Sequence, residues 1–174
     1  MTDTLTTLVD VQEKQLAWSE VGTKEGVDYK FAQYFVSDDG GRSEYGYKGS
    51  TRDCFCRSLA ITSDLTYQEA YDMTNEYAKS ERTTKRKRGK SSARTGVHTE
   101  TAHKILDALG FEWTPTMKIG SGCKVHCRAD ELPSGKLILN LTRHFTAMID
   151  GVIHDTHDPS RQGTRCVYGY WKKV

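Results

Sequence analysis

Residues 144–155 read HFTAMIDGVIHD, in which an Asp-Gly pair separates two apolar runs. This pattern predicts a β-hairpin with a two-residue type I′ turn, because Asp and Gly tolerate the positive φ angles that both turn positions need. The turn fixes the register and sets Thr146 opposite Asp155. Since side chains alternate along a strand, His144 and Asp155 should share one face as diagonal neighbours. The stretch therefore predicts an imidazole beside a carboxylate.

The other face of this hairpin is mostly apolar. Its members are Phe145, Ala147, Ile149, Val152 and His154. We expect this face to pack on the core, which makes His154 a structural residue and leaves the His144 face for chemistry.

Outside the hairpin, the pattern predicts helices first and strands afterwards. Helical spacing and start signals favour helices over 54–62, 66–79 and 99–109, the last ending at Gly110. The strand candidates are 111–117, 124–127, 136–141, 144–149, 152–156 and 165–171, and an earlier aromatic pair, 30–36 and 42–48, fits a hairpin. We therefore predict an α+β fold in which N-terminal helices pack on a C-terminal antiparallel sheet.

A length of 174 residues suits one domain. Residues 1–28 are polar and predict a loosely attached arm or short helix, and 29–174 predict the folded domain. No secretory signal and no apolar run long enough to span a bilayer is seen, so the expected location is the cytoplasm, or the host cytoplasm for a viral protein, with no membrane partner.

The net charge of +2 conceals a strongly basic segment. Residues 79–94 hold eight Lys or Arg against one Glu, and we expect a mobile loop over 80–96 because so few apolar residues are available for burial. Its basic run consists of Lys85, Arg86, Lys87 and Arg88. This run is a candidate binding site for nucleic acid or an acidic protein, or a lid over a cleft, although a charge run is more often only a solvated loop.

The best nucleophile candidate is Cys54, which follows Asp53 at the start of the first predicted helix. A thiol at a helix N-terminus near an imidazolium is activated, and the first-turn N–H groups there can bind an oxyanion. Asp53 is the expected N-cap residue. Cys56 lies about 200° further around the helix, on the apolar side, so we expect it to be buried.

The run DCFCRSLAI, followed far downstream by RHFTAMIDGVIHDTHDPS, resembles papain-like cysteine peptidases, and most of all the small peptidase-like proteins encoded by bacteriophages and bacteria. The resemblance covers roughly residues 50–170. It implies that Cys54 is the nucleophile, His144 the general base and acid, and Asp155 the residue that steadies the imidazole. The implied reaction is acyl transfer through a thioester by a peptidase, isopeptidase or amidase, on a protein or peptide substrate.

The sequence departs from this family in the segment before the nucleophile. Papain-like enzymes usually place a Gln there to complete the oxyanion hole, and YKGSTRD at 47–53 has none. Lys48, Ser50 and Thr51 are the candidate substitutes. The departure motivates an alternative function, a non-catalytic binding module of the same fold that uses the basic run.

The five cysteines are an odd number, so at least one thiol is free and a disulfide scaffold is not expected. Cys123, His126 and Cys127 raise the alternative of a zinc site, but their spacing is unlike standard zinc fingers. Strand alternation would also send His126 and Cys127 to opposite faces. We therefore expect neither a metal nor another cofactor.

Overall fold

The computed structural model describes residues 15–24, 27–84, 89–118 and 120–174, with backbone alone for 15–33. These residues form an α+β fold with a seven-stranded mixed sheet and, in the described part of the chain, three helices. The helices are α2 (Cys54–Thr62), α3 (Tyr67–Lys79) and α4 (Thr99–Ala108). No helix in these ranges has the length and apolar character needed to cross a membrane.

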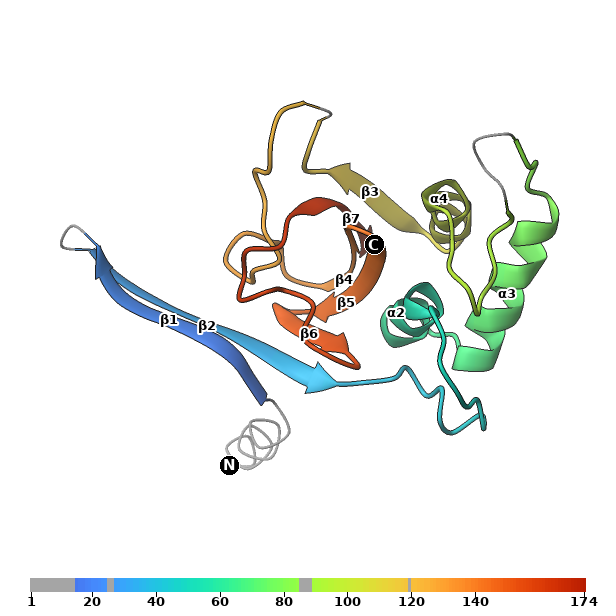
Figure 1. Cartoon of the computed structure of the whole chain (residues 1–174), viewed down its shortest axis with the longest axis horizontal. Coiled ribbons are helices and arrows are strands. Elements are labelled where there is room, and N and C mark those ends of the chain that lie inside the picture. Colours follow the sequence, from blue (N-terminus) through green and yellow to red (C-terminus); the bar gives the residue numbers. More distant parts are fainter. Residues whose placement is uncertain (1–14, 25–26, 85–88, 119) are drawn as a thin grey trace.

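The strands follow the order β1-β2-β6-β5-β4-β7-β3 across the sheet. Their bounds are β1 (Gln15–Lys24), β2 (Val27–Ser37), β3 (Phe111–Pro115), β4 (Lys136–Leu141), β5 (His144–Ile149), β6 (Val152–Asp155) and β7 (Val167–Lys173). Every neighbouring pair is antiparallel except β2 and β6, which run parallel. The three helices gather on one side of the sheet, and the β1–β2 ribbon extends away from the other (Figure 1).

The three predicted helices are confirmed to within a residue or two at each end, because their boundary signals are local. Thr66 and Glu69 form a reciprocal capping box at the start of α3, where the Thr66 hydroxyl accepts a hydrogen bond from the Glu69 N–H. Beyond the end of α4, Gly110 adopts a φ of 77°, the left-handed conformation in which helices commonly end.

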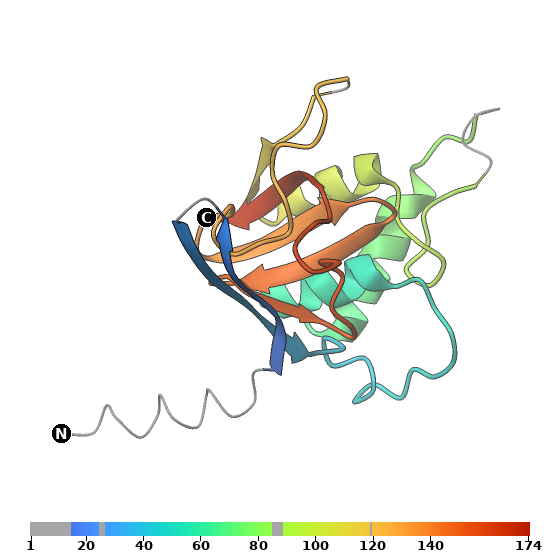
Figure 2. The same ribbon diagram turned by 60° about the vertical axis from the view of Figure 1, so that its left-hand side comes forward.

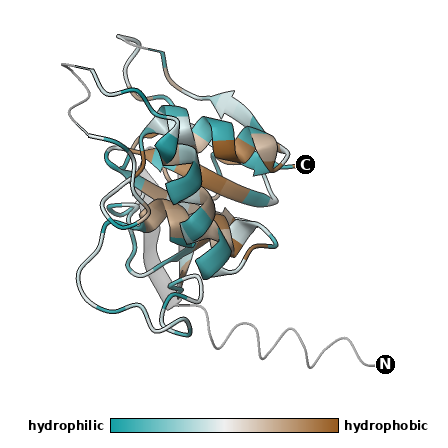
Figure 3. Cartoon of the chain, turned by 90° about the vertical axis from the view of Figure 1, so that its right-hand side faces the viewer, coloured by the Kyte–Doolittle hydropathy of each residue, from teal (hydrophilic) through white to brown (hydrophobic). Residues whose placement is uncertain are grey.

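The sheet is covered by apolar clusters on both faces. One cluster joins the helices to the sheet and contains Phe55, Ile105, Phe145 and Trp171 among others. Figure 2 shows the helices packed against the sheet. From the side of the helices, hydrophobic sheet segments are visible behind them (Figure 3). A second cluster lies around Leu139, Met148 and Ile153. The expectation that one hairpin face alone forms core is therefore wrong, because Val125, Cys127 and Leu132 from the segment before β4 cover the second face.

The β5–β6 hairpin has the predicted turn and register. Asp150 and Gly151 both have positive φ, 47° and 81°. Ile149 pairs with Val152, and Ala147 pairs with His154. The sequence-based register is thus confirmed, and it places the first residue of β5 near the last residue of β6.

The expected hairpin between 30–36 and 42–48 is wrong in its second strand. The first run lies in β2, but β2 pairs with β1 and β6, and in 42–48 residues 42–46 form turns and no residue is in a strand. The carboxylates of Asp38 and Asp39 accept hydrogen bonds from the backbone N–H groups of Gly40 and Gly41 and turn the chain away. The chain therefore turns at this point instead of continuing into the second strand of a hairpin.

Two further expectations need correction. Residues 15–24 form strand β1 and not a short helix, because their backbone pairs with β2; residues 1–14 lie outside the described part of the chain. Residues 124–127 form no strand, and their backbone pairs only through an isolated bridge between His126 and Cys166, within the described residues. Both results depend on long-range pairing, which local strand propensity does not report.

Part of the basic segment is packed against the helices. Ser91 and Ala93 are buried, and the Ala93 N–H donates to the side-chain oxygen of Asn75 in α3. The Ser91 hydroxyl accepts from the N–H of His98 just before α4. Residues 85–88, which contain the predicted binding run, lie outside the described part of the chain.

Gly151→Ala should destabilise the fold by about 2 kcal/mol, because it combines a left-handed φ with an overlap. A Cβ at this position would lie 2.8 Å from the Cβ of Ala129. Gly110→Ala is the matched control, since its φ is also positive but nothing lies within 4 Å of the added Cβ. Urea denaturation measures both losses, and equal losses would contradict this account of the turn.

Candidate active site

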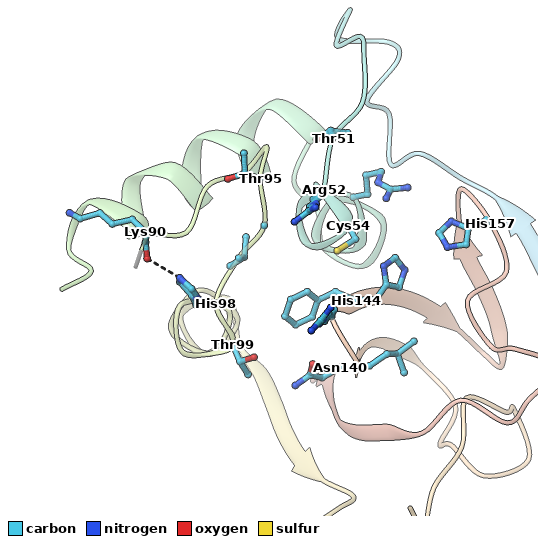
Figure 4. Close-up of a pocket in the computed structure, with 17 residues that line it drawn as sticks. Thr51, Arg52, Cys54, Lys90, Thr95, His98, Thr99, Asn140, His144 and His157 are labelled. Carbon is cyan, nitrogen blue, oxygen red and sulfur yellow. Dashed lines mark hydrogen bonds between the residues drawn. The ribbon is translucent and has the colours of Figure 1, made fainter. Parts of the chain in front are cut away.

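The three predicted catalytic residues lie together at one end of the hairpin. Nε2 of His144 lies 2.7 Å from Oδ2 of Asp155, across the β5–β6 pair. The sulfur of Cys54, in the first turn of α2, lies beside the His144 ring (Figure 4). Because Asp155 occupies Nε2, Nδ1 is the ring nitrogen left for the sulfur. A thiol, an imidazole and a carboxylate therefore lie side by side, and a hydrogen bond joins the imidazole to the carboxylate.

The environment of His144 favours its protonated form. Burial alone would lower its pKa, but the hydrogen bonds to Asp155 and Cys54 outweigh burial and raise the pKa to about 9. The imidazole is therefore an imidazolium at neutral pH. An imidazolium next to a cysteine favours the thiolate, which is the nucleophilic form of the side chain.

Asp155 is buried but remains ionised, because cations and donors surround it. Burial acts to raise its pKa, and the hydrogen bond and charge of His144 together with the charge of Arg57 bring it below its usual value. Arg57 donates to Oδ1 at 3.3 Å, and the backbone N–H of Thr156 donates to the same oxygen at 2.7 Å. The carboxylate thus has partners on both oxygens, which fixes its orientation toward the imidazole.

Arg57 also links the site to the start of α2. Its Nε donates to Oδ1 of Asp53, one turn earlier on the helix, at 3.0 Å. Asp53 also accepts from the Tyr67 hydroxyl at 2.6 Å and forms an ion pair with Arg42. Burial and the bond to Asp53 raise the pKa of Tyr67, so it stays a neutral donor. The cluster thus contains two carboxylates, Asp53 and Asp155, and two guanidinium groups, Arg42 and Arg57, so its charges balance.

This arrangement corrects the predicted role of Asp53. It occupies the N-cap position of α2, but its side chain makes no capping hydrogen bond. Both of its oxygens are used by Arg57, Tyr67 and Arg42. The Asp53 side chain therefore does not cap the first-turn N–H groups of α2. An oxyanion site beside Cys54 would need these N–H groups to be free.

A cleft of about 850 Å³ opens beside Cys54 and His144. One wall comes from the start of α2, another from the segment that leads into α4, and a third from the ends of β4 and β5 (Figure 4). The labelled lining residues are Thr51, Arg52, Cys54, Lys90, Thr95, His98, Thr99, Asn140, His144 and His157. The partly exposed Cys54 sulfur is therefore accessible to a molecule in this cleft.

The three candidate oxyanion donors differ in position. Thr51 lines the cleft, but its hydroxyl donates to the carbonyl of Arg94 at 2.9 Å, which uses its only donor. Lys48 and Ser50 are exposed and are not among the residues that line the cleft. Backbone N–H groups at the start of α2 are thus better placed than these side chains to bind an oxyanion.

The other cysteines are shielded from the cleft. Cys56 is fully buried, as expected, and burial raises its pKa to about 12. Cys127 is also buried, and burial raises its pKa to about 12. Cys123 and Cys166 form a disulfide, a pairing that the sequence did not indicate. Across the described residues, no group of three or more His, Cys, Asp or Glu side chains could hold a metal ion.

Two site residues were missed in the sequence. Arg57 follows Asp53 by four positions, a spacing that pairs side chains along a helix and could have signalled the ion pair. Asn140 is a polar residue in the apolar run KLILNL, at the end of β4 opposite Phe145. A polar side chain on a core-facing position at a strand end is a local signal for a site, and Asn140 lines the cleft.

Comparisons with protein-family models, with curated protein sequences and with solved structures found no match.

Arg57→Gln should lower the free energy of unfolding by about 3 kcal/mol, because it leaves buried carboxylates without their shared cation. Arg42→Gln is the matched control, since Arg42 is more exposed and contacts Asp53 alone in this cluster; we expect a loss of about 1 kcal/mol. Urea denaturation gives both values. A loss for Arg57→Gln no larger than that of the control would contradict the bridging role.

The His144 ring should stay protonated up to pH 8 and lose its proton as the pH rises through about 9. Asp155→Asn removes a group that raises the pKa and keeps the burial that lowers it, so the midpoint should fall below pH 7. Histidine ring NMR measures both midpoints. Asp38→Asn, beside His154 and outside the cleft, should leave the His144 midpoint in place; an unchanged midpoint in Asp155→Asn would refute the assignment.

Proposed function

We propose that this chain is a cysteine-dependent hydrolase of the papain-like type, acting as a peptidase, isopeptidase or amidase. One observation carries the proposal: a partly exposed cysteine in an open cleft lies beside an imidazole that a buried carboxylate orients. The three groups come from three separate elements, α2, β5 and β6. Such a convergence has the geometry of a nucleophile, its base and the residue that orients the base.

The arrangement of elements supports the papain-like type. The nucleophile lies at the N-terminus of a helix that packs against antiparallel strands, and the base opens one of those strands. The chain order Cys, His, Asp is the order that the resemblance implied. Phe55, next to the nucleophile, packs edge-on against Phe145, next to the base, with ring centroids 5.3 Å apart. This contact holds the helix tip against the strand.

The reaction would proceed in two steps. The Cys54 thiolate attacks the carbonyl carbon of an amide, and the negative charge moves to the carbonyl oxygen, beside the first-turn N–H groups of α2. The His144 imidazolium gives its proton to the leaving nitrogen, the C–N bond breaks, and a thioester remains. Neutral His144 then takes a proton from water, which attacks the thioester and releases a carboxylic acid and the Cys54 thiolate.

Asp155 keeps the imidazole ring aligned throughout these steps. With its two oxygens bonded to His144 and to Arg57 and Thr156, it can stabilise the imidazolium without taking up the proton. An amine could replace water in the second step, which would make the same site a transferase.

A non-catalytic binding module of the same fold is the second candidate. It is favoured by one observation, namely that Lys48, Ser50 and Thr51 offer no free side-chain donor in the cleft. A binding module would keep the fold and the cleft while lacking turnover.

Iodoacetamide should modify Cys54 stoichiometrically at neutral pH, at least about 10-fold faster than Cys56 or Cys127, because these two thiols are buried and protonated. Peptide mass mapping identifies the modified residue. His144→Ala should slow the modification of Cys54 by about 10-fold, because the imidazolium that favours its thiolate is lost. His154→Ala is the matched control, since His154 also contacts an aspartate, Asp38, but lies outside the cleft.

A Cys54 that reacts no faster than the buried thiols would refute the proposed function. For a reactive Cys54, an activated ester such as p-nitrophenyl acetate separates the two candidates. A burst followed by steady release of nitrophenol, absent in Cys54→Ser, supports the hydrolase. An acyl adduct on Cys54 that never turns over contradicts it and supports the binding module.

A further inference from the structure

We propose that the cleft beside Cys54 selects an acidic peptide, with Asp or Glu side chains next to the bond that is cleaved. The inference rests on the proposed function, because it names the substrate class of the same site. It is carried by the charges of the cleft wall, which are independent of the geometry of Cys54, His144 and Asp155.

The lining of the cleft contains basic side chains and no acidic one. Among its 17 residues are four Arg or Lys and three His, with neither Asp nor Glu. The basic members are Arg52, Arg57, Lys90, His98, Arg143, His144 and His157. The chain as a whole has nearly equal numbers of acidic and basic residues, 23 and 25, so this one-sided lining is a local feature of the cleft.

Of the four Arg and Lys side chains in the lining, two already have partners and two have none within the described residues. Arg57 is committed to Asp53 and Asp155, and Nζ of Lys90 donates to the carbonyl of Lys79 at 2.7 Å. Arg52 and Arg143 are exposed, and neither forms an ion pair within the described residues. Their guanidinium groups are free to bind an anion in the cleft.

The backbone holds Arg52 and Arg143 on different walls. Arg143 directly precedes His144, in the turn between β4 and β5, with a φ of 55°. Arg52 lies two residues before Cys54, and its N–H donates to the carbonyl of Arg94 at 2.8 Å. A bound chain that presents its carbonyl to Cys54 would therefore meet a guanidinium from the α2 side and another from the β5 side.

The cluster beneath the cleft does not offset these charges. Asp53 and Asp155 are balanced by Arg42 and Arg57, so the imidazolium of His144 adds a positive charge to the cleft. A cleft lined by charge of one sign concentrates ligands of the opposite sign. Guanidinium groups bind carboxylates through paired hydrogen bonds, which fixes the ligand as well as attracting it.

Nucleic acid would also be attracted to such a cleft, but the site favours a peptide. Attack by Cys54 needs a carbonyl carbon with a leaving group, which a peptide or isopeptide bond provides. The acidic groups of a peptide are carried on the same chain as that bond, one or two residues from it. An acidic peptide therefore satisfies the charges and the chemistry of the cleft together.

The first test compares two alkylating agents that differ in charge, iodoacetate and iodoacetamide. The ratio of their rates at Cys54 should exceed the ratio at N-acetylcysteine amide by about 5-fold, since a focused positive field raises the local concentration of the anion. Using a ratio cancels any change in the reactivity of the sulfur itself. Arg52→Gln/Arg143→Gln should return the ratio to that of the model thiol, and 0.5 M salt should reduce it.

Arg82→Gln is the matched control, because Arg82 is exposed and does not line this cleft. It should leave the ratio unchanged. A reactive Cys54 with no preference for iodoacetate would overturn the present inference and leave the proposed function standing. A Cys54 that reacts slowly with both reagents would instead refute the proposed function.

The second test measures binding to the Cys54→Ser chain, which needs no catalysis. A fluorescent peptide rich in Asp and Glu should bind at least about 10-fold more tightly than its Asn and Gln counterpart, as expected where paired guanidinium groups meet carboxylates. The advantage should disappear in Cys54→Ser/Arg52→Gln/Arg143→Gln. Equal binding of the two peptides, or stronger cleft-dependent binding of a single-stranded oligonucleotide, would overturn the inference.

Discussion

The hydrogen bond between Nε2 of His144 and Oδ2 of Asp155 is the interaction on which the site depends. It joins two strands, and it requires a carboxylate to stay ionised with only 4% of its side chain exposed. Burial opposes this ionisation, so the carboxylate needs other partners to remain charged. Arg57 and the Thr156 N–H supply them on the second oxygen. The imidazole can thus be protonated at neutral pH because its neighbour is kept anionic.

The same requirement ties the helix to the sheet. Arg57 reaches from α2 to Asp155 in β6 and also binds Asp53 in front of the helix, so the position of the helix tip and that of the carboxylate are set together. The backbone approaches closely here, since a Cβ on Gly40 would lie 2.8 Å from the Arg57 carbonyl oxygen. Cys54, between Asp53 and Arg57, is held toward His144 as a result. The charged cluster therefore orients Cys54 as well as His144.

Local sequence signals predicted the parts of this site but not all of their connections. The Asp-Gly turn fixed the β5–β6 register, and caps and periodicity gave α2, α3 and α4, because each of these depends on neighbouring residues. The parallel pairing of β2 with β6 joins residues over 100 positions apart and has no local signature. For the same reason the cleft wall from 89–99 and the contact of Arg57 with Asp155 could not be read from spacing.

The two neighbouring thiols of α2 illustrate how position on one helix decides reactivity. Cys54 and Cys56 are two residues apart, and the helical rotation turns them to different surroundings. Cys56 faces α3 and the packed end of the basic segment, where it contacts Thr74 and Ala93 and where burial raises its pKa to about 12. Cys54 faces the imidazolium and the open cleft. A shift of α2 by two residues would be needed to bring Cys56 to the position of Cys54. The Asp53–Arg57–Asp155 contacts that fix the helix therefore also determine which sulfur faces the cleft.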